Sequence, residues 1–161
     1  MSDFIYSLQK EIIPQDKHNM ATTQIFKLLF VDDDPDFRDF HRAELQKAGF
    51  DLIEAENETE ALDLLQSGQK FDIAVIDVIL ANPDGGFSLA YHIKQQFPEM
   101  PVVLVSDTDS KFGVEFSMNS EAERRWMKCD DFLSKPVRTE QLISTAYRHL
   151  GVDLEEGDAP H

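Results

Sequence analysis

The sequence has few of the residues on which several common kinds of site depend. Its single cysteine, Cys129, excludes an intramolecular disulfide and any paired-cysteine zinc or redox site. Only 15 lysines and arginines stand against 31 acidic residues, so the clustered positive charge that binds DNA or RNA phosphates is missing. No stretch approaches the ~20 apolar residues of a membrane helix. We therefore expect neither nucleic acid nor a membrane as a direct partner.

The start of the chain also lacks a recognisable export signal. A basic region followed by an apolar run and a small-residue cleavage site is absent, which together with the lone cysteine favours a reducing cytoplasm. The five histidines show no ligand-like spacing. We expect all of them on the surface, namely His18, His41, His92, His149 and His161.

Short apolar runs alternate with helical patterns through most of the chain, which predicts βαβ units and a parallel sheet. Strands are predicted at residues 27–31 (KLLFV), 52–55, 72–76 (DIAVI), 101–105 (PVVLV) and 131–133. Helices are predicted after Pro35, after a capping box of Asn57 and Glu60, around residues 87–97, and from a Thr139 cap to Gly151. Right-handed crossovers then give an α/β fold, a doubly wound three-layer sandwich with five parallel strands.

This predicted domain covers residues 27–150 of the 161, and the two ends of the chain differ from it. In the extension of residues 1–26, apolar side chains repeat at helical spacing from Phe4 to Ile12 before Pro14 ends the pattern. A short amphipathic helix is predicted there, either loosely docked or in contact with a partner or a second copy of the chain. Residues 151–161 carry four acids and no base, which predicts a disordered, solvated tail.

Polar side chains follow the strands, at the point where each strand ends. Asp32 and Asp33 come after the first strand, Asp77 after the third, Ser106 after the fourth and Lys135 after the fifth. In a doubly wound sheet these ends meet at one crevice, where ligands bind. Three carboxylates brought so close together need a positive charge among them.

These residue types suit one kind of chemistry. Clustered carboxylates are hard oxygen ligands for Mg²⁺, which also prefers phosphate oxygens. The Lys135 ammonium adds a fixed positive charge, and the Ser106 hydroxyl can donate a hydrogen bond to an anion. The group that fits such a pocket is a phosphoryl, with Asp77 in line as the nucleophile. A structural alternative is that acids at strand ends only cap the following helices, as Asp34 before Pro35 is expected to do.

Residues 27–150 resemble the receiver domain of two-component response regulators. The resemblance rests on four segments in their order along the chain: LLFVDDDPDFR, VIDVILANPDGG, VVLVSD and DDFLSKPV. It implies a flavodoxin-like fold with strand order 2-1-3-4-5, which is the order found in members of this family. It also implies that Asp77 accepts a phosphoryl group from a sensor histidine kinase or a histidine phosphotransfer protein, and that an output partner reads the change.

The same resemblance implies the roles of the other residues. Asp32 and Asp33 match the acidic pair that holds Mg²⁺, with Asp77 and the backbone carbonyl of Ile79 completing the protein ligands. Lys135 and Ser106 match the lysine and the hydroxyl residue that contact the phosphoryl group. Phe132 falls where the family has a switch aromatic, although a core phenylalanine would look the same in sequence.

The sequence departs from the family pattern in three places. Asp107 stands where receivers have a small residue, so its carboxylate is expected to hinder phosphorylation. Ile79 and Thr108 occupy the two positions that tune water attack, and neither orients water as an amide or carboxylate does, which predicts slow dephosphorylation. An insertion at residues 107–119 contains an alternating apolar segment, 112–118, before a helix predicted from Ser120 that carries Trp126; it either remodels the partner surface or fills core.

Two other functions fit parts of the pattern. A receiver-like interaction module that works without phosphorylation would explain Asp107 and the insertion, but the complete acidic pair, acceptor and lysine argue against it. A haloacid-dehalogenase-like phosphohydrolase also uses aspartate, Ser/Thr, lysine and Mg²⁺. Its motif on the first strand needs Thr or Val where this chain has Asp36, and insertions of useful length for a cap are missing.

Overall fold

The computed structural model describes residues 24–80, 85–107 and 129–152. Strands and helices alternate along these residues in the order β1 (Phe26–Val31), α3 (Pro35–Lys47), β2 (Phe50–Ala55), α4 (Glu58–Gln66), β3 (Ile73–Asp77), α5 (Gly85–Gln96), β4 (Val102–Asp107), β5 (Asp131–Lys135) and α8 (Thr139–His149). Every predicted strand and helix in the described residues is present, with its ends within a few residues of the prediction. None of these helices has the length and apolar character needed to cross a bilayer.

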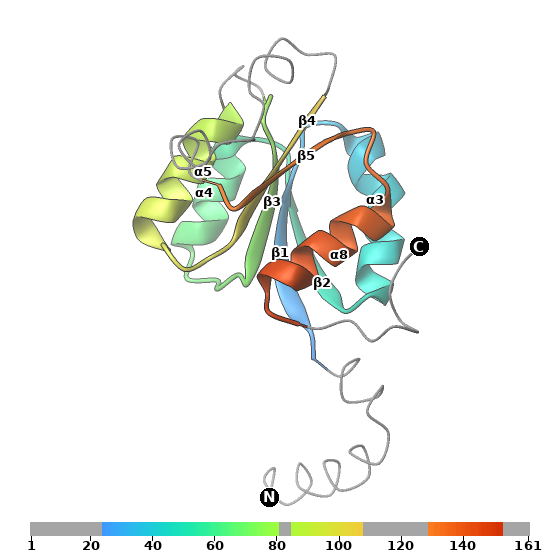
Figure 1. Cartoon of the computed structure of the whole chain (residues 1–161). Coiled ribbons are helices and arrows are strands. Elements are labelled where there is room, and N and C mark those ends of the chain that lie inside the picture. Colours follow the sequence, from blue (N-terminus) through green and yellow to red (C-terminus); the bar gives the residue numbers. More distant parts are fainter. Residues whose placement is uncertain (1–23, 81–84, 108–128, 153–161) are drawn as a thin grey trace, which may run out of the picture.

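All five strands run parallel in the order β2-β1-β3-β4-β5 (Figure 1). This confirms the predicted doubly wound, flavodoxin-like arrangement. The chain reverses its direction of travel across the sheet between β1 and β3, and the carboxyl ends of these strands open a crevice at that point. Asp32 follows β1 and Asp77 ends β3, so the fold places two predicted site residues at the mouth of this crevice.

Helices cover both faces of the sheet, with α4 and α5 on one face and α3 and α8 on the other (Figure 1). Side chains alternate between the two faces along each strand, as the pleat requires. On β1, Leu29 and Val31 belong to the core under α4 and α5, while Leu28 and Phe30 belong to the core under α3 and α8. Both faces are therefore buried, which explains why the strand sequences are continuous apolar runs.

The helix starts follow largely from local sequence. Asp34 caps α3, and its Oδ1 accepts from the backbone N–H of Asp36 at 3.0 Å. Asn57 caps α4, and its Oδ1 accepts from the Glu60 N–H at 2.8 Å, while the Glu60 carboxylate accepts from the Glu56 N–H at 2.9 Å. Both predicted caps are confirmed.

The prediction that Thr139 caps the last helix is wrong. Thr139 is the first residue of α8, and Arg138 before it occupies the cap position without a side-chain hydrogen bond. The Thr139 hydroxyl instead lies 2.6 Å from Nδ1 of His41 on α3. The Thr139 hydroxyl bonds His41 instead of capping its own helix. A sequence pattern cannot reveal this partner, because His41 lies on another helix.

Candidate functional site

Three charged side chains meet at the carboxyl ends of β1, β3 and β5. The Lys135 Nζ donates to Asp32 Oδ2 at 3.0 Å and to Asp77 Oδ2 at 3.3 Å. Asp33 lies beside them, and Asp32, Asp33 and Asp77 each offer a carboxylate oxygen within 4.8 Å of the others. The structure thus brings together four of the predicted site residues from three separate strands.

Local backbone geometry holds the two buried carboxylates in place. Asp32 is 1% exposed, and its Oδ1 accepts from the N–H of Asp34, the residue that caps α3, at 2.9 Å. Asp77 is 8% exposed, and its Oδ1 accepts from the N–H of Ile79 at 3.1 Å. In both residues one carboxylate oxygen is fixed by the backbone and the other faces Lys135, whereas Asp33 is exposed to solvent.

The electrostatics of this cluster favour the arrival of positive charge. Burial, followed by the nearby Asp32 charge, raises the pKa of Asp77 from 3.8 to about 6, against the opposing attraction of Lys135. Burial also raises the pKa of Asp32. Burial by itself would lower the pKa of Lys135, but the two carboxylates outweigh it and raise that pKa. One ammonium is therefore not enough to offset the cost of burying both carboxylates.

A close backbone approach completes this side of the crevice. The Gly86 N–H donates to the Val78 carbonyl at 2.9 Å, and a Cβ on Gly86 would lie 2.2 Å from the Asp77 carbonyl oxygen. Only glycine permits this contact, which packs the first turn of α5 against the end of β3. Gly86 thus allows α5 to pack beside Asp77.

Ser106 and Phe132 lie at the edge of the same region. Ser106 is buried near the end of β4, and its Oγ donates to the neighbouring Asp107 carbonyl at 3.4 Å, the long end of the hydrogen-bond range. Phe132 is partly buried on β5, opposite Leu104, and packs against the core under α4 and α5. Asp107 ends β4, is exposed, and stands opposite Lys135 in the β4–β5 register.

Side chains on α3 that the sequence pattern does not assign to the site also reach it. Lys135 Nζ lies over the ring of Phe37, 4.1 Å from its centroid, and a pocket of about 460 Å³ opens beside them, lined also by Phe40, His41 and Asp107. The prediction that every histidine lies on the surface is wrong for His41, which is 1% exposed. A signal was present, because Phe37, His41 and Leu45 recur every four residues and so share one face of the helix.

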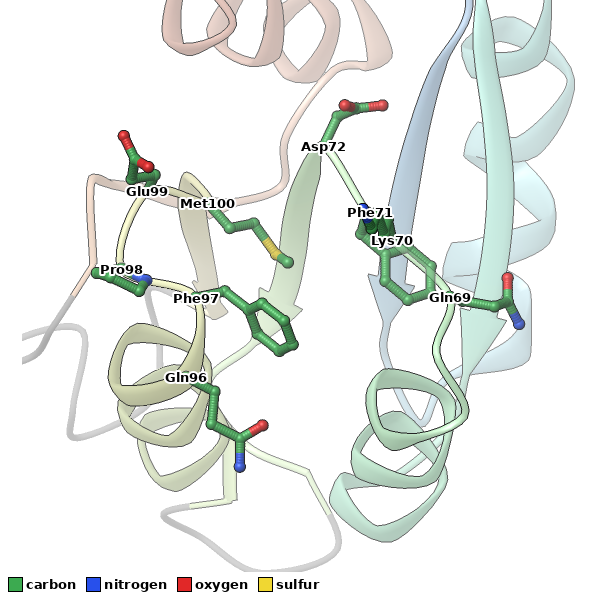
Figure 2. Close-up of a pocket in the computed structure, with 9 residues that line it drawn as sticks. All are labelled: Gln69, Lys70, Phe71, Asp72, Gln96, Phe97, Pro98, Glu99 and Met100. Atoms are coloured by element: carbon green, nitrogen blue, oxygen red, sulfur yellow. The ribbon is translucent and has the colours of Figure 1, made fainter.

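A second hollow of about 470 Å³ lies at the other end of the sheet, between the segments that lead into β3 and β4. Figure 2 shows Phe97 and Met100 on one side of it and Phe71 on the other, with Gln69, Gln96 and Glu99 around them. Its described lining residues include no cluster of carboxylates like the one at the carboxyl ends. Among the described residues, the carboxylate cluster lies at the opposite end of the sheet.

Several sequence predictions fall outside the described residues. They concern the amphipathic extension up to residue 23, Thr108, the rest of the insertion, the helix predicted from Ser120 with Trp126, and the tail beyond residue 152. Those predictions stay open.

Comparisons with known proteins agree with this geometry. The family model described as the response regulator receiver domain matches residues 28–147. The response regulator protein PilR of Pseudomonas aeruginosa is 34% identical over 134 residues, which are 81% of this chain and 28% of the relative, so this chain spans little more than a quarter of that protein.

Solved structures show the same similarity. The receiver domain of the Francisella response regulator 1452 is 28% identical, with a TM-score of 0.64 over 78% of this chain and 97% of the other. NtrX from Brucella abortus, solved in complex with ADP, is 28% identical, with a TM-score of 0.68 over 80% of this chain and 27% of the other. The chemotaxis response regulator CheY4 of Vibrio cholerae is 25% identical, with a TM-score of 0.64 over 78% of this chain and 99% of that chain.

Proposed function

Because this chain belongs to the response regulator receiver-domain family of two-component signalling, we propose that it is a phospho-accepting switch whose acceptor is Asp77. The donor is a phosphohistidine on a sensor histidine kinase or a histidine phosphotransfer protein in the cytoplasm. One observation carries the proposal: Lys135 Nζ lies within 3.3 Å of both Asp32 and Asp77, with Asp33 beside them. This is a carboxylate nucleophile with an ammonium and two further carboxylates at its side.

The transfer uses the Asp77 carboxylate as an in-line nucleophile. One carboxylate oxygen attacks phosphorus, the P–O bond forms as the P–N bond to the donor imidazole breaks, and the imidazole leaves with the bonding electron pair. The Ile79 N–H and the Lys135 ammonium orient the carboxylate from two sides, at 3.1 and 3.3 Å. After transfer, Lys135 stays in place to balance the charge of the phosphoryl oxygens.

The donor set fits a hard divalent cation. Three carboxylate oxygens within 4.8 Å of one another suit Mg²⁺, and burial together with the Asp32 charge raises the pKa of Asp77, so a cation at the cluster would stabilise its ionised form. Asp32, Asp33 and Asp77 would hold the ion, with the Ile79 backbone carbonyl as a further ligand. When bound, Mg²⁺ supplies charge neutralisation to phosphoryl oxygens.

Ser106 and Phe132 connect Asp77 to a surface that a partner protein can bind. Ser106 is buried near the end of β4, beside the strand that ends in Asp77, and its hydroxyl can donate a hydrogen bond to a phosphoryl oxygen on Asp77. Movement of Ser106 opens space for Phe132, which is only partly buried on the neighbouring strand. Phosphorylation thereby shifts an existing equilibrium between two arrangements of this face, rather than creating a new one.

The test is the intact mass of the protein after incubation with a small phosphodonor and Mg²⁺. The wild-type chain is expected to gain the mass of one phosphoryl group, and Asp77→Asn is expected to gain none. Asp63→Asn, a matched change of an exposed carboxylate on α4, should label like the wild type. Equal labelling of wild type and Asp77→Asn would refute Asp77 as the acceptor, and absence of labelling in the wild type would favour an interaction module that works without phosphorylation.

A further inference from the structure

One face of α3 contacts both ends of the segment that carries Lys135. At one end, Lys135 Nζ lies 4.1 Å from the centroid of the Phe37 ring. At the other, Thr139 Oγ1 lies 2.6 Å from His41 Nδ1. Phe37 and His41 are four residues apart on the helix, and Lys135 and Thr139 are four apart on the connection from β5 to α8. Two neighbouring positions of one helix thus hold both ends of that connection.

The Phe37 ring is itself held from two sides. It packs at 5.9 Å against Phe30, a fully buried residue of β1, and at 4.5 Å, edge to face, against the His41 imidazole. Aromatic pairs at these separations favour defined ring orientations. The negative ring face is therefore presented to the ammonium of Lys135, on which the two carboxylates act as well.

His41 suits this place as an uncharged polar group. It is buried against Phe37 and Phe40, and burial, followed by the positive charge of Lys135, lowers its pKa. A neutral imidazole hydrogen-bonds the buried Thr139 hydroxyl without bringing a second cation to the carboxylates. The negative charge of Glu140, beside Thr139, raises the pKa of His41, but this effect is the smallest of the three.

We propose that Phe37 is a positioning residue for Lys135, and that the His41–Thr139 hydrogen bond keeps Phe37 and the β5–α8 connection in register. The consequence for phosphoryl transfer rests on the function proposed above. A lysine side chain is long and flexible, and its carboxylate partners change when a phosphoryl group and a metal enter the site. The ring does not change, so it keeps the ammonium aimed at the phosphoryl group throughout the transfer.

The contact is tested first without phosphorylation, by a double-variant cycle on the metal-free protein. Urea unfolding is measured for wild type, Phe37→Leu, Lys135→Gln and the double variant. Leucine retains the apolar packing and the helix propensity but has no ring face. We expect Phe37→Leu to lower the folding equilibrium constant in both backgrounds. The factor by which it does so should be roughly three- to tenfold larger when Lys135 is present than in the Lys135→Gln background. Equal effects in the two backgrounds would overturn the contact as a source of positioning.

The effect on the reaction is tested by replacing Phe37 with mono-, di- and trifluorophenylalanine. These side chains keep nearly the same shape while the negative charge of the ring face falls step by step. The rate of Asp77 phosphorylation by a small donor should fall in the same steps, by about three- to tenfold over the series. The matched control is the same series at Phe50, which is buried against Phe26 and Tyr147 near the start of β2 and should leave the rate unchanged.

The hydrogen bond is tested with His41→Leu, Thr139→Val and the pair together. If the bond acts as one unit, either single variant slows phosphorylation and the double variant slows it no further. A rate that is constant across the fluorine series, or additive losses at His41 and Thr139, would overturn the inference. If the wild type takes no phosphoryl group at all, the proposed function fails, while the unfolding cycle still decides whether Phe37 holds Lys135.

Discussion

Replacement of Asp77 by asparagine should stabilise the metal-free protein at neutral pH. Burial and the Asp32 charge raise the pKa of this carboxyl from 3.8 to about 6, which means that the folded state disfavours its ionised form. About two pKa units at 1.36 kcal/mol each give an upper limit of about 3 kcal/mol. Asparagine has nearly the same shape and no charge, so we expect the free energy of unfolding to rise by about 1 to 3 kcal/mol.

The pH dependence of this gain follows from the sign of the pKa shift. The pKa of Asp77 is higher in the folded state than in the unfolded state, so the folded state binds the proton more tightly. The stabilisation that this gives is fully present below about pH 4 and is lost as the pH rises through about 6. Asparagine does not titrate. The difference in stability between Asp77→Asn and wild type should therefore be small near pH 4 and reach its full value above about pH 7.

Urea unfolding with a chelator present, repeated at several pH values, measures this difference. Asp63→Asn on the exposed side of α4 changes the net charge by the same amount and should alter stability by no more than about 0.5 kcal/mol at any pH. Added Mg²⁺ should stabilise the wild type and narrow its gap to Asp77→Asn, because only the complete carboxylate set binds the ion well. A destabilised Asp77→Asn, or a gain that is constant from pH 4 to 8, would refute the electrostatic argument.

Other contacts predict effects of definite direction. Gly86→Ala should lose about 3 kcal/mol or fail to fold, because the added Cβ would lie 2.2 Å from the Asp77 carbonyl oxygen; a wild-type urea midpoint would contradict this. Asn57→Ala should lose about 1 kcal/mol with the cap of α4, measured in the same way, and an unchanged midpoint would refute it. The phosphoryl group on Asp77 should be long-lived beside the apolar Ile79 and shorter-lived in Ile79→Gln, as timed by intact mass; loss within seconds in the wild type would contradict slow dephosphorylation.

Much of the architecture could be predicted because strands and helices have different periods. The runs at residues 27–31, 72–76 and 101–105 are apolar throughout, as strands buried on both faces must be, and they became β1, β3 and β4. The helix starts at Asp34 and Asn57 depend on side chains that bond the backbone within three residues. Such local interactions are visible in sequence, because the residues that make them are neighbours in the chain.

The errors and omissions concern residues whose partners are distant in the chain. The sequence pattern predicts a local cap at Thr139, but its hydroxyl hydrogen-bonds His41, 98 residues away. The lack of ligand-like spacing predicts His41 on the surface, although it lies on the apolar stripe of α3 and is buried. Phe37 is an ordinary stripe residue until the fold brings Lys135 over its ring. The spacing of residues along the chain does not predict that Thr139 contacts His41 or that Phe37 contacts Lys135.

The amino-acid sequence alone determined the α/β class, the succession of strands and helices, and which charged residues stand at the strand ends. Each of these depends on residues within one strand, helix or turn. Packing of the folded chain set how close Asp32, Asp77 and Lys135 come, how far burial raises the pKa of Asp77, and which helix supports the lysine. Those quantities depend on distance and on exclusion from water, and both arise only when segments far apart in the chain pack together.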